Sequence, residues 1–159
     1  MSVPSIRVVV ADDDPVFRAA VRDVLAEDGR FLVVAEQGSG HGLGRVVADT
    51  RASLVLVDVR MPSGGAAAVS AALGARRVGG SVAVVGLSGE TSTVAVAAMF
   101  GAGATGFIAK GATGPELPDL LARCAAGERV LGVPEAEAAV RRALSLVPDE
   151  PRPLTVVRG

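Results

Sequence analysis

Short apolar runs alternate along the chain with longer segments in which apolar residues return at helical spacing. The runs are rich in valine and lie at Ile6–Ala11, Phe31–Ala35, Leu54–Val57, Val82–Leu87 and Thr105–Ala109. The segments of helical spacing cover about residues 15–28, 41–51, 64–77, 91–100 and 116–126. Uninterrupted apolar strands are typical of parallel sheets covered on both faces. Strands that alternate with helices in this way predict an α/β fold of right-handed βαβ units.

The composition excludes several classes of protein. Half of the 159 residues are hydrophobic and 21% are charged, which suits one folded domain with a tail. A formal net charge of -1 and the absence of Trp and Tyr give no sign of a nucleic-acid surface. We find neither a signal peptide nor an apolar stretch long enough to span a bilayer, so we expect a cytoplasmic protein. The single cysteine, Cys124, cannot form an internal disulfide and is interpreted as a small core residue.

Polar side chains follow four of the predicted strands. Asp12 and Asp13 follow the first strand, Asp58 the third, Ser88 the fourth and Lys110 the fifth. The C-terminal ends of parallel strands meet at one edge of a sheet. Two carboxylates about 4 Å apart there repel each other by roughly 4 kcal/mol at an effective dielectric near 20. Mg²⁺ relieves such repulsion, and the lysine and the serine add donors for a phosphoryl group. The set predicts phosphoryl transfer to a carboxylate.

Four motifs at these strand ends resemble the receiver domain of two-component response regulators. They are Val10-Ala11-Asp12-Asp13-Asp14-Pro15, Asp58-Val59-Arg60-Met61-Pro62, Leu87-Ser88 and Gly106-Phe107-Ile108-Ala109-Lys110-Gly111. The resemblance covers about residues 5–128, so we expect a receiver domain at 1–128, similar to the subclass with LuxR-type helix-turn-helix output. It implies a doubly wound, flavodoxin-like (βα)5 fold with strand order 2-1-3-4-5. It also implies a signalling switch that is not an enzyme beyond its own phosphotransfer and dephosphorylation.

The resemblance implies a role for each matching residue. Asp58 is the expected phosphoacceptor, to which a histidine kinase or a small phosphodonor transfers a phosphoryl group. Asp13 is expected to ligate Mg²⁺ directly and Asp12 mainly through water. Asp58 itself and the backbone carbonyl of Arg60 complete the expected metal site. Lys110 is expected to hold a phosphoryl oxygen.

Two further residues are expected to respond to phosphorylation. The resemblance implies that Ser88 swings to hydrogen-bond the phosphoryl group. Phe107 occupies the family's aromatic switch position, where it would couple Ser88 to a face formed by the helix at 91–100, the strand at 105–109 and the helix at 116–126. Homodimerisation through this face and control of transcription are the implied outputs, with no membrane partner.

Arg60 and Glu90 occupy the two variable positions that influence dephosphorylation in this family. We expect their side chains to pair across the phosphorylation site. Such a pair would slow the attack of water on the phosphorylated aspartate.

Two other functions are compatible with parts of the pattern. Residues Asp12 to Val16 fit D-x-D-x-[TV], the nucleophile motif of haloacid-dehalogenase-type phosphatases, which would use Asp12 and Asp14. That alternative lacks the acidic pair needed after the lysine and leaves the motif at Asp58 unexplained. The second alternative is a receiver that no longer accepts phosphate and only binds partners. The intact set of acidic residues argues against this alternative. Asp14 is interpreted as a helix N-cap before Pro15.

The segment at 129–159 is the predicted C-terminal tail. Its apolar residues predict a short helix at about 134–146. Pro148, Pro151 and Pro153 then predict an extended linker. The tail is too short for a helix-turn-helix domain, so we expect no direct nucleic-acid binding by this segment.

Overall fold

A parallel sheet forms the centre of the molecule. The computed structural model describes residues 5–62, 64–75, 80–89, 92–111, 114–132 and 154–157. Within these ranges the strands are β1 (Ile6–Ala11), β2 (Phe31–Gln37), β3 (Leu54–Asp58), β4 (Ala83–Ser88), β5 (Gly106–Ala109), β6 (Arg129–Gly132) and β7 (Leu154–Val156). Their order is β2-β1-β3-β4-β5-β6-β7, and all neighbouring strands run parallel. The predicted α/β fold and the order 2-1-3-4-5 are therefore confirmed for the first five strands.

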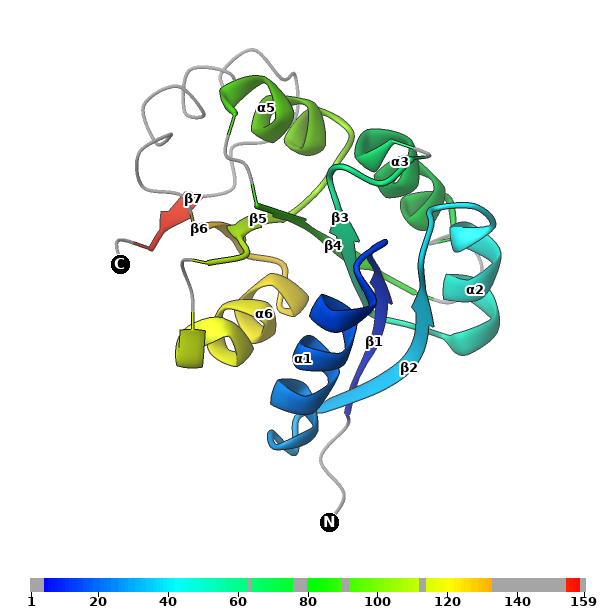
Figure 1. The fold of residues 1–159 in the computed structure, drawn as a ribbon, viewed down its shortest axis with the longest axis vertical. Coiled ribbons are helices and arrows are strands. Elements are labelled where there is room, and N and C mark those ends of the chain that lie inside the picture. The colour runs from blue at the N-terminus through cyan, green and yellow to red at the C-terminus, as the bar shows by residue number, and fades with distance from the viewer. Residues whose placement is uncertain are drawn as a thin grey trace.

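The helices of the described residues cover both faces of this sheet (Figure 1). They are α1 (Pro15–Ala26), α2 (Leu43–Thr50), α3 (Gly65–Gly74), α5 (Thr93–Gly101) and α6 (Leu117–Ala125), with a 3-10 turn at Gly114–Glu116 before α6. Helices α1 and α6 pack on one face, and α2, α3 and α5 pack on the other. In the part of the chain that the structure describes, every helix is too short or too polar to cross a bilayer.

Alternate side chains of each central strand enter opposite halves of the core. Val8 and Val10 of β1 pack with α1, whereas Val9 packs on the face covered by α2 and α3. The five residues of β3 are all buried. Burial on both faces explains why the sequences of these strands are uninterrupted apolar runs and do not alternate between apolar and polar residues.

Helix α1 begins immediately after the acidic residues of β1. The carboxylate of Asp14 accepts hydrogen bonds from the backbone N–H groups of Val16 at 2.9 Å and Phe17 at 3.2 Å. Pro15 occupies the first helical position, where its missing N–H has no intrahelical partner to lose. Asp14 is thus an N-cap, as the sequence predicts.

The sheet extends beyond the five predicted strands. Strand β6 pairs with β5 through Val130 and Leu131, and β7 pairs with β6. Both strands lie in the segment at 129–159, for which a tail with a linker was expected. Each of them is too short for its hydrophobic pattern to predict a strand from the sequence. Only the pairing with a neighbouring strand identifies them as part of the sheet. The short helix predicted at about 134–146 lies outside the described residues.

The cysteine lies in the core, as interpreted from the sequence. Cys124 is fully buried on α6, and its Sγ lies so close to β5 that a Cβ at Gly106 would approach it to 2.7 Å. Burial raises the pKa of this thiol to about 12. The side chain therefore acts as a small apolar group that lets α6 pack closely on the sheet.

Candidate functional site

Three strand ends bring four charged residues together. Asp12 follows β1 together with Asp13, Asp58 ends β3, and Lys110 follows β5. The carboxylate oxygens of the three aspartates lie within 4.8 Å of one another. The Nζ of Lys110 lies 2.6 Å from Oδ2 of Asp12 and 3.7 Å from Oδ1 of Asp58. These four side chains meet at one edge of the sheet. We call the three aspartates the acidic cluster and Lys110 its lysine.

The carboxylates of the acidic cluster differ in their exposure to solvent. Asp12 is fully buried and Asp58 is 4% exposed, whereas Asp13 is exposed. Burial raises the pKa of Asp58, and the negative charge of Asp12 acts in the same direction. The backbone N–H of Arg60 and the charge of Lys110 oppose this rise. A divalent cation would favour the ionised form of every carboxylate here, so the three aspartates are a candidate metal site.

Backbone hydrogen bonds hold the strand ends in place around the cluster. The N–H of Asp14 donates to Oδ1 of Asp12 at 2.9 Å, and the N–H of Arg60 donates to Oδ1 of Asp58 at 3.3 Å. The N–H of Lys110 donates to the carbonyl of Ser88 at 2.9 Å. The Asp58 carboxylate is therefore held at the end of β3, and the Lys110 backbone is tied to the end of β4, the strand that lies between β3 and β5.

One aromatic contact at the site was not predicted. The Nζ of Lys110 lies 4.3 Å from the centre of the Phe17 ring, which belongs to the first turn of α1. A ring face attracts an ammonium ion at this distance and orients its flexible stem. The sequence offers no signal for this pair, because the two residues lie far apart in the chain.

The two predicted switch residues are buried near the cluster. Ser88 is 1% exposed at the end of β4, beside Ala109 of β5. Phe107 is fully buried and packs on the α5 side of the sheet. A Cβ at Gly86 would approach its ring to 3.1 Å, so the absence of a side chain there leaves room for the ring. In this structure the Phe107 ring therefore lies inward.

The remaining predicted site residues are only partly described. Arg60 is exposed beside Asp58, to which its N–H donates. Glu90 lies outside the described residues, so its pairing with Arg60 stays a prediction. The carboxylate of Asp14 is engaged in capping α1, which does not favour the phosphatase alternative that would use it for chemistry.

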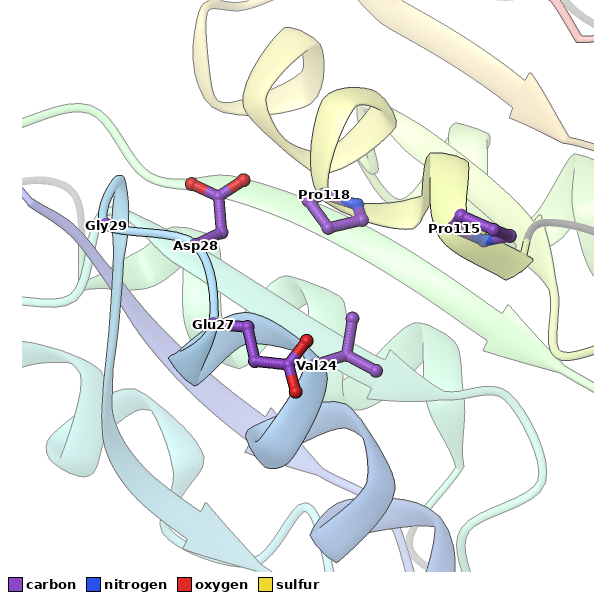
Figure 2. A pocket seen from close by; sticks show the side chains of 6 residues that line it. All are labelled: Val24, Glu27, Asp28, Gly29, Pro115 and Pro118. Atoms are coloured by element: carbon purple, nitrogen blue, oxygen red, sulfur yellow. The ribbon is translucent and has the colours of Figure 1, made fainter.

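A groove runs between α1 and α6 beside the cluster. One part of it is lined by Val24, Glu27, Asp28, Gly29, Pro115 and Pro118, as Figure 2 shows. A second, mainly apolar part is lined by residues that include Phe17, Val24 and Lys110. The residues that line these two hollows include none of the three aspartates. The groove is therefore a neighbour of the cluster and not its binding pocket.

Comparisons with known proteins identify the family that the chain resembles. The model of the response regulator receiver domain family matches residues 8–122. The probable transcriptional regulatory protein NarL of Mycobacterium tuberculosis is 32% identical over 126 residues, which cover 79% of this chain and 57% of the relative. A protein-glutamate methylesterase/protein-glutamine glutaminase of a Nocardioides species is 34% identical over 110 residues, which cover 68% of this chain and 30% of that protein.

A solved structure shares the fold. The signal receiver domain of the putative response regulator NarL from Mycobacterium tuberculosis superposes with a TM-score of 0.71 at 29% identity. The match covers 79% of this chain and all of that domain. The chain thus spans a little over half of the NarL relative's length and less than a third of the methylesterase. Residues 8–122, which the family model matches, include the three aspartates and Lys110.

Proposed function

The chain belongs to the response regulator receiver domain family, and on that premise we propose that it is a signalling switch activated by phosphorylation of Asp58. The observation that carries the proposal is the meeting of three carboxylates and one ammonium at a single sheet edge. Asp58 is the proposed acceptor because its motif matches that of the family's phosphoacceptor. Its carboxylate lies within 4.8 Å of those of Asp12 and Asp13 and 3.7 Å from the Lys110 ammonium.

Mg²⁺ fits the donor set of the cluster. Asp13 and Asp58 would hold the ion through their carboxylates, Asp12 would hold it mainly through water, and Arg60 would add its backbone carbonyl. The ion would neutralise the charge that gathers on the transferred phosphoryl oxygens. A set made only of oxygen ligands favours a hard cation over zinc, which prefers nitrogen and sulfur ligands.

The nucleophile of the transfer is the ionised carboxylate of Asp58. One oxygen of Asp58 attacks the phosphorus of a phosphohistidine on a histidine kinase, or of a small phosphodonor. A P–O bond to Asp58 forms while the bond to the donor breaks, and the donor leaves with that electron pair. Lys110 then pairs with a phosphoryl oxygen in place of the Asp58 carboxylate. Through this exchange of partners, phosphorylation of Asp58 changes the contacts of the residue that follows β5.

Ser88 and Phe107 are the proposed reporters of phosphorylation. The Ser88 hydroxyl would turn to donate to a phosphoryl oxygen, which frees space at the end of β4. The inward ring of Phe107 packs against the neighbouring β4 residue Gly86, so its packing would respond to that movement. The protein would exchange between an inactive and an active state. If the phosphoryl group makes contacts that favour the active state by a few kcal/mol, the equilibrium shifts towards that state.

The proposed output is control of transcription through a homodimer. The NarL relative carries a name that describes transcriptional regulation. The expected dimer face consisted of the helix at 91–100, the strand at 105–109 and the helix at 116–126. Strand β5 pairs with β6 on its outer side and therefore offers no free edge. The face would accordingly consist of α5, α6 and the C-terminal strands.

Intact-mass measurement after treatment with acetyl phosphate tests the function. The chain with Mg²⁺ should gain the mass of one phosphoryl group, and removal of Mg²⁺ by EDTA should prevent the gain. Asp58→Asn should remain unmodified, whereas Asp49→Asn, an exposed position on α2, should be modified like the wild type. A phosphoryl group that persists in Asp58→Asn would overturn the proposal.

The phosphatase alternative makes the opposite prediction. A haloacid-dehalogenase-type enzyme would hydrolyse p-nitrophenyl phosphate with many turnovers. That activity would be abolished by Asp12→Asn and retained by Asp58→Asn. We expect no such turnover by the wild type.

A further inference from the structure

An arginine of α1 holds the backbone of the acidic cluster. The guanidinium of Arg18 donates a hydrogen bond from Nη1 to the backbone carbonyl of Asp12. Its Nε lies 3.8 Å from Oε1 of Glu36 on β2, and its side chain is 20% exposed. The function proposed above assigns no role to Arg18.

The other polar groups of Asp12 are also engaged. Its N–H donates to the carbonyl of Gln37 at 2.9 Å. Its carboxylate accepts from the N–H of Asp14 and contacts the ammonium of Lys110. The carbonyl that Arg18 holds belongs to the planar peptide unit that joins Asp12 to Asp13. Arg18 therefore sets the direction in which the chain enters Asp13.

An irregularity in β2 supplies the partner of Arg18. The pairing of β1 with β2 shifts by one residue, from Val8 opposite Val33 to Val9 opposite Ala35. Before the shift, Val33 packs on the α1 side of the sheet, and after it Glu36 lies opposite Val10, which also packs on that side. Because strand side chains alternate between faces, one extra residue moves an even-numbered position onto the α1 face. The bulge thus brings the Glu36 carboxylate to the helix.

We propose that Arg18 is a positioning residue for the metal site. It orients the Asp12–Asp13 peptide so that both carboxylates converge with Asp58 before a cation binds. Mutual repulsion would otherwise spread the carboxylates apart, and the cation would have to order the loop as it bound. This inference rests on the proposed function, because it requires a divalent cation at the three aspartates.

Loss of Arg18 would change the affinity for Mg²⁺ in opposite directions, depending on whether the residue acts by positioning or only by its charge. Arg18 is a cation close to a cation site, so removal of its charge alone would strengthen Mg²⁺ binding. Loss of a residue that orients metal ligands weakens metal binding, commonly by about 10- to 100-fold. The direction of the change in affinity therefore separates the two roles.

Calorimetric titration with MgCl₂ provides the test. We expect Arg18→Ala to bind Mg²⁺ about tenfold more weakly than the wild type. The matched control is Arg22→Ala, one turn further along α1. Arg22 also pairs with Glu36, at 3.1 Å, and it forms a second ion pair with Asp23. Arg22→Ala should therefore leave the affinity within about twofold, because it leaves the Asp12 carbonyl bonded.

The melting temperature of the metal-free protein separates positioning from folding. If Arg18→Ala melts at a lower temperature yet binds Mg²⁺ as tightly as the wild type, Arg18 is merely structural and the proposal fails. An equal loss of affinity in Arg22→Ala would overturn it too. If Arg18→Ala does not fold, Glu36→Gln removes the charge that holds Arg18 while keeping the arginine. We then expect a smaller loss of affinity, and an unchanged affinity would overturn the proposal.

Asp13→Ala distinguishes failure of this inference from failure of the metal site itself. Loss of Mg²⁺ binding in Asp13→Ala together with normal binding in Arg18→Ala would overturn only the role of Arg18. A wild-type chain that binds no Mg²⁺, or an Asp13→Ala variant that binds it normally, would overturn the metal site of the proposed function.

Discussion

At the scale of single residues, Lys110 balances the charge of the acidic cluster. The Oδ2 atom of Asp12 is buried and, among the described residues, the Lys110 ammonium is its polar partner. The ring of Phe17 also contacts that ammonium. A buried carboxylate without a partner is costly, so the metal-free protein depends on this lysine.

Replacement of this lysine should lower stability more without a bound metal than with one. We expect Lys110→Met to lower the free energy of unfolding by about 1–3 kcal/mol without Mg²⁺, less than for a fully buried ion pair because Lys110 is partly exposed. Saturating Mg²⁺ should recover part of that loss, because the ion supplies positive charge to the same carboxylates. Urea unfolding with and without Mg²⁺ measures both values. An equal loss in the two conditions would contradict the idea that the lysine and the metal balance the same charges.

At the scale of elements, a network of charges joins α6 to the turn between α1 and β2. The Nη2 of Arg30 lies 2.6 Å from Oδ2 of Asp28 and 2.7 Å from Oδ1 of Asp119 on α6. Both helices on this face of the sheet are thereby linked beside the groove of Figure 2, which Asp28 also lines. The three groups are partly or largely exposed to solvent, so the link should be sensitive to salt and pH.

The contribution of Asp28 to the free energy of unfolding should decrease at acidic pH. The side-chain hydrogen bond from Arg30 lowers the pKa of Asp28 from 3.8 to about 2. A carboxylate with a lowered pKa stabilises the fold at pH values above its unfolded pKa, and that stabilisation is lost as the pH falls through the folded pKa. The difference in unfolding free energy between the wild type and Asp28→Asn should therefore be constant near neutral pH. It should shrink as the pH falls from about 4 towards 2.

Urea unfolding at a series of pH values measures this difference. High salt should reduce it at neutral pH, because the paired groups are partly exposed to solvent. A difference that stays constant down to the lowest pH at which both proteins fold would contradict the role of the Arg30 hydrogen bond.

At the scale of the whole molecule, the C-terminal strand covers the end of the sheet. Leu154 and Val156 pack on the half of the core next to α5, and Val157 packs on the half next to α6. Arg123 of α6 donates to the hydroxyl of Thr155 at 3.2 Å. Figure 1 shows β7 beside β6, at the opposite end of the sheet from β2. The strand therefore protects the buried edge of β6 from solvent and from other chains.

Removal of this strand should expose an edge that favours association. We expect a chain that ends at residue 153 to lose about 2–4 kcal/mol of unfolding free energy, because three partly buried apolar side chains are deleted. Light scattering should detect more self-association than for the full chain at the same concentration. Thr155→Ala is the matched control, which removes the bond to Arg123 but keeps the strand, and it should cost less. A truncated chain of full stability and unchanged size would contradict this role.

Local sequence signals identified the elements that form most of the fold. The Asp14-Pro15 pair marks the start of α1 because capping depends on only a few neighbouring residues. The valine-rich runs mark the central strands because burial on both faces demands apolar side chains throughout. The positions of Asp12, Asp58 and Lys110 at strand ends were evident for the same reason, since strand ends follow from the runs.

The sequence by itself determined which residues are able to carry the chemistry, because residue type and strand-end position are local properties. Only the tertiary structure decided what supports them. Arg18 reaches the Asp12 carbonyl through helix geometry, and its partner Glu36 faces it because of a one-residue bulge in β2. The pairing of β6 and β7 likewise depends on contacts between residues distant in the chain. Neither the register of a strand nor the contacts between distant segments follow from local pattern, because both depend on how the whole core packs.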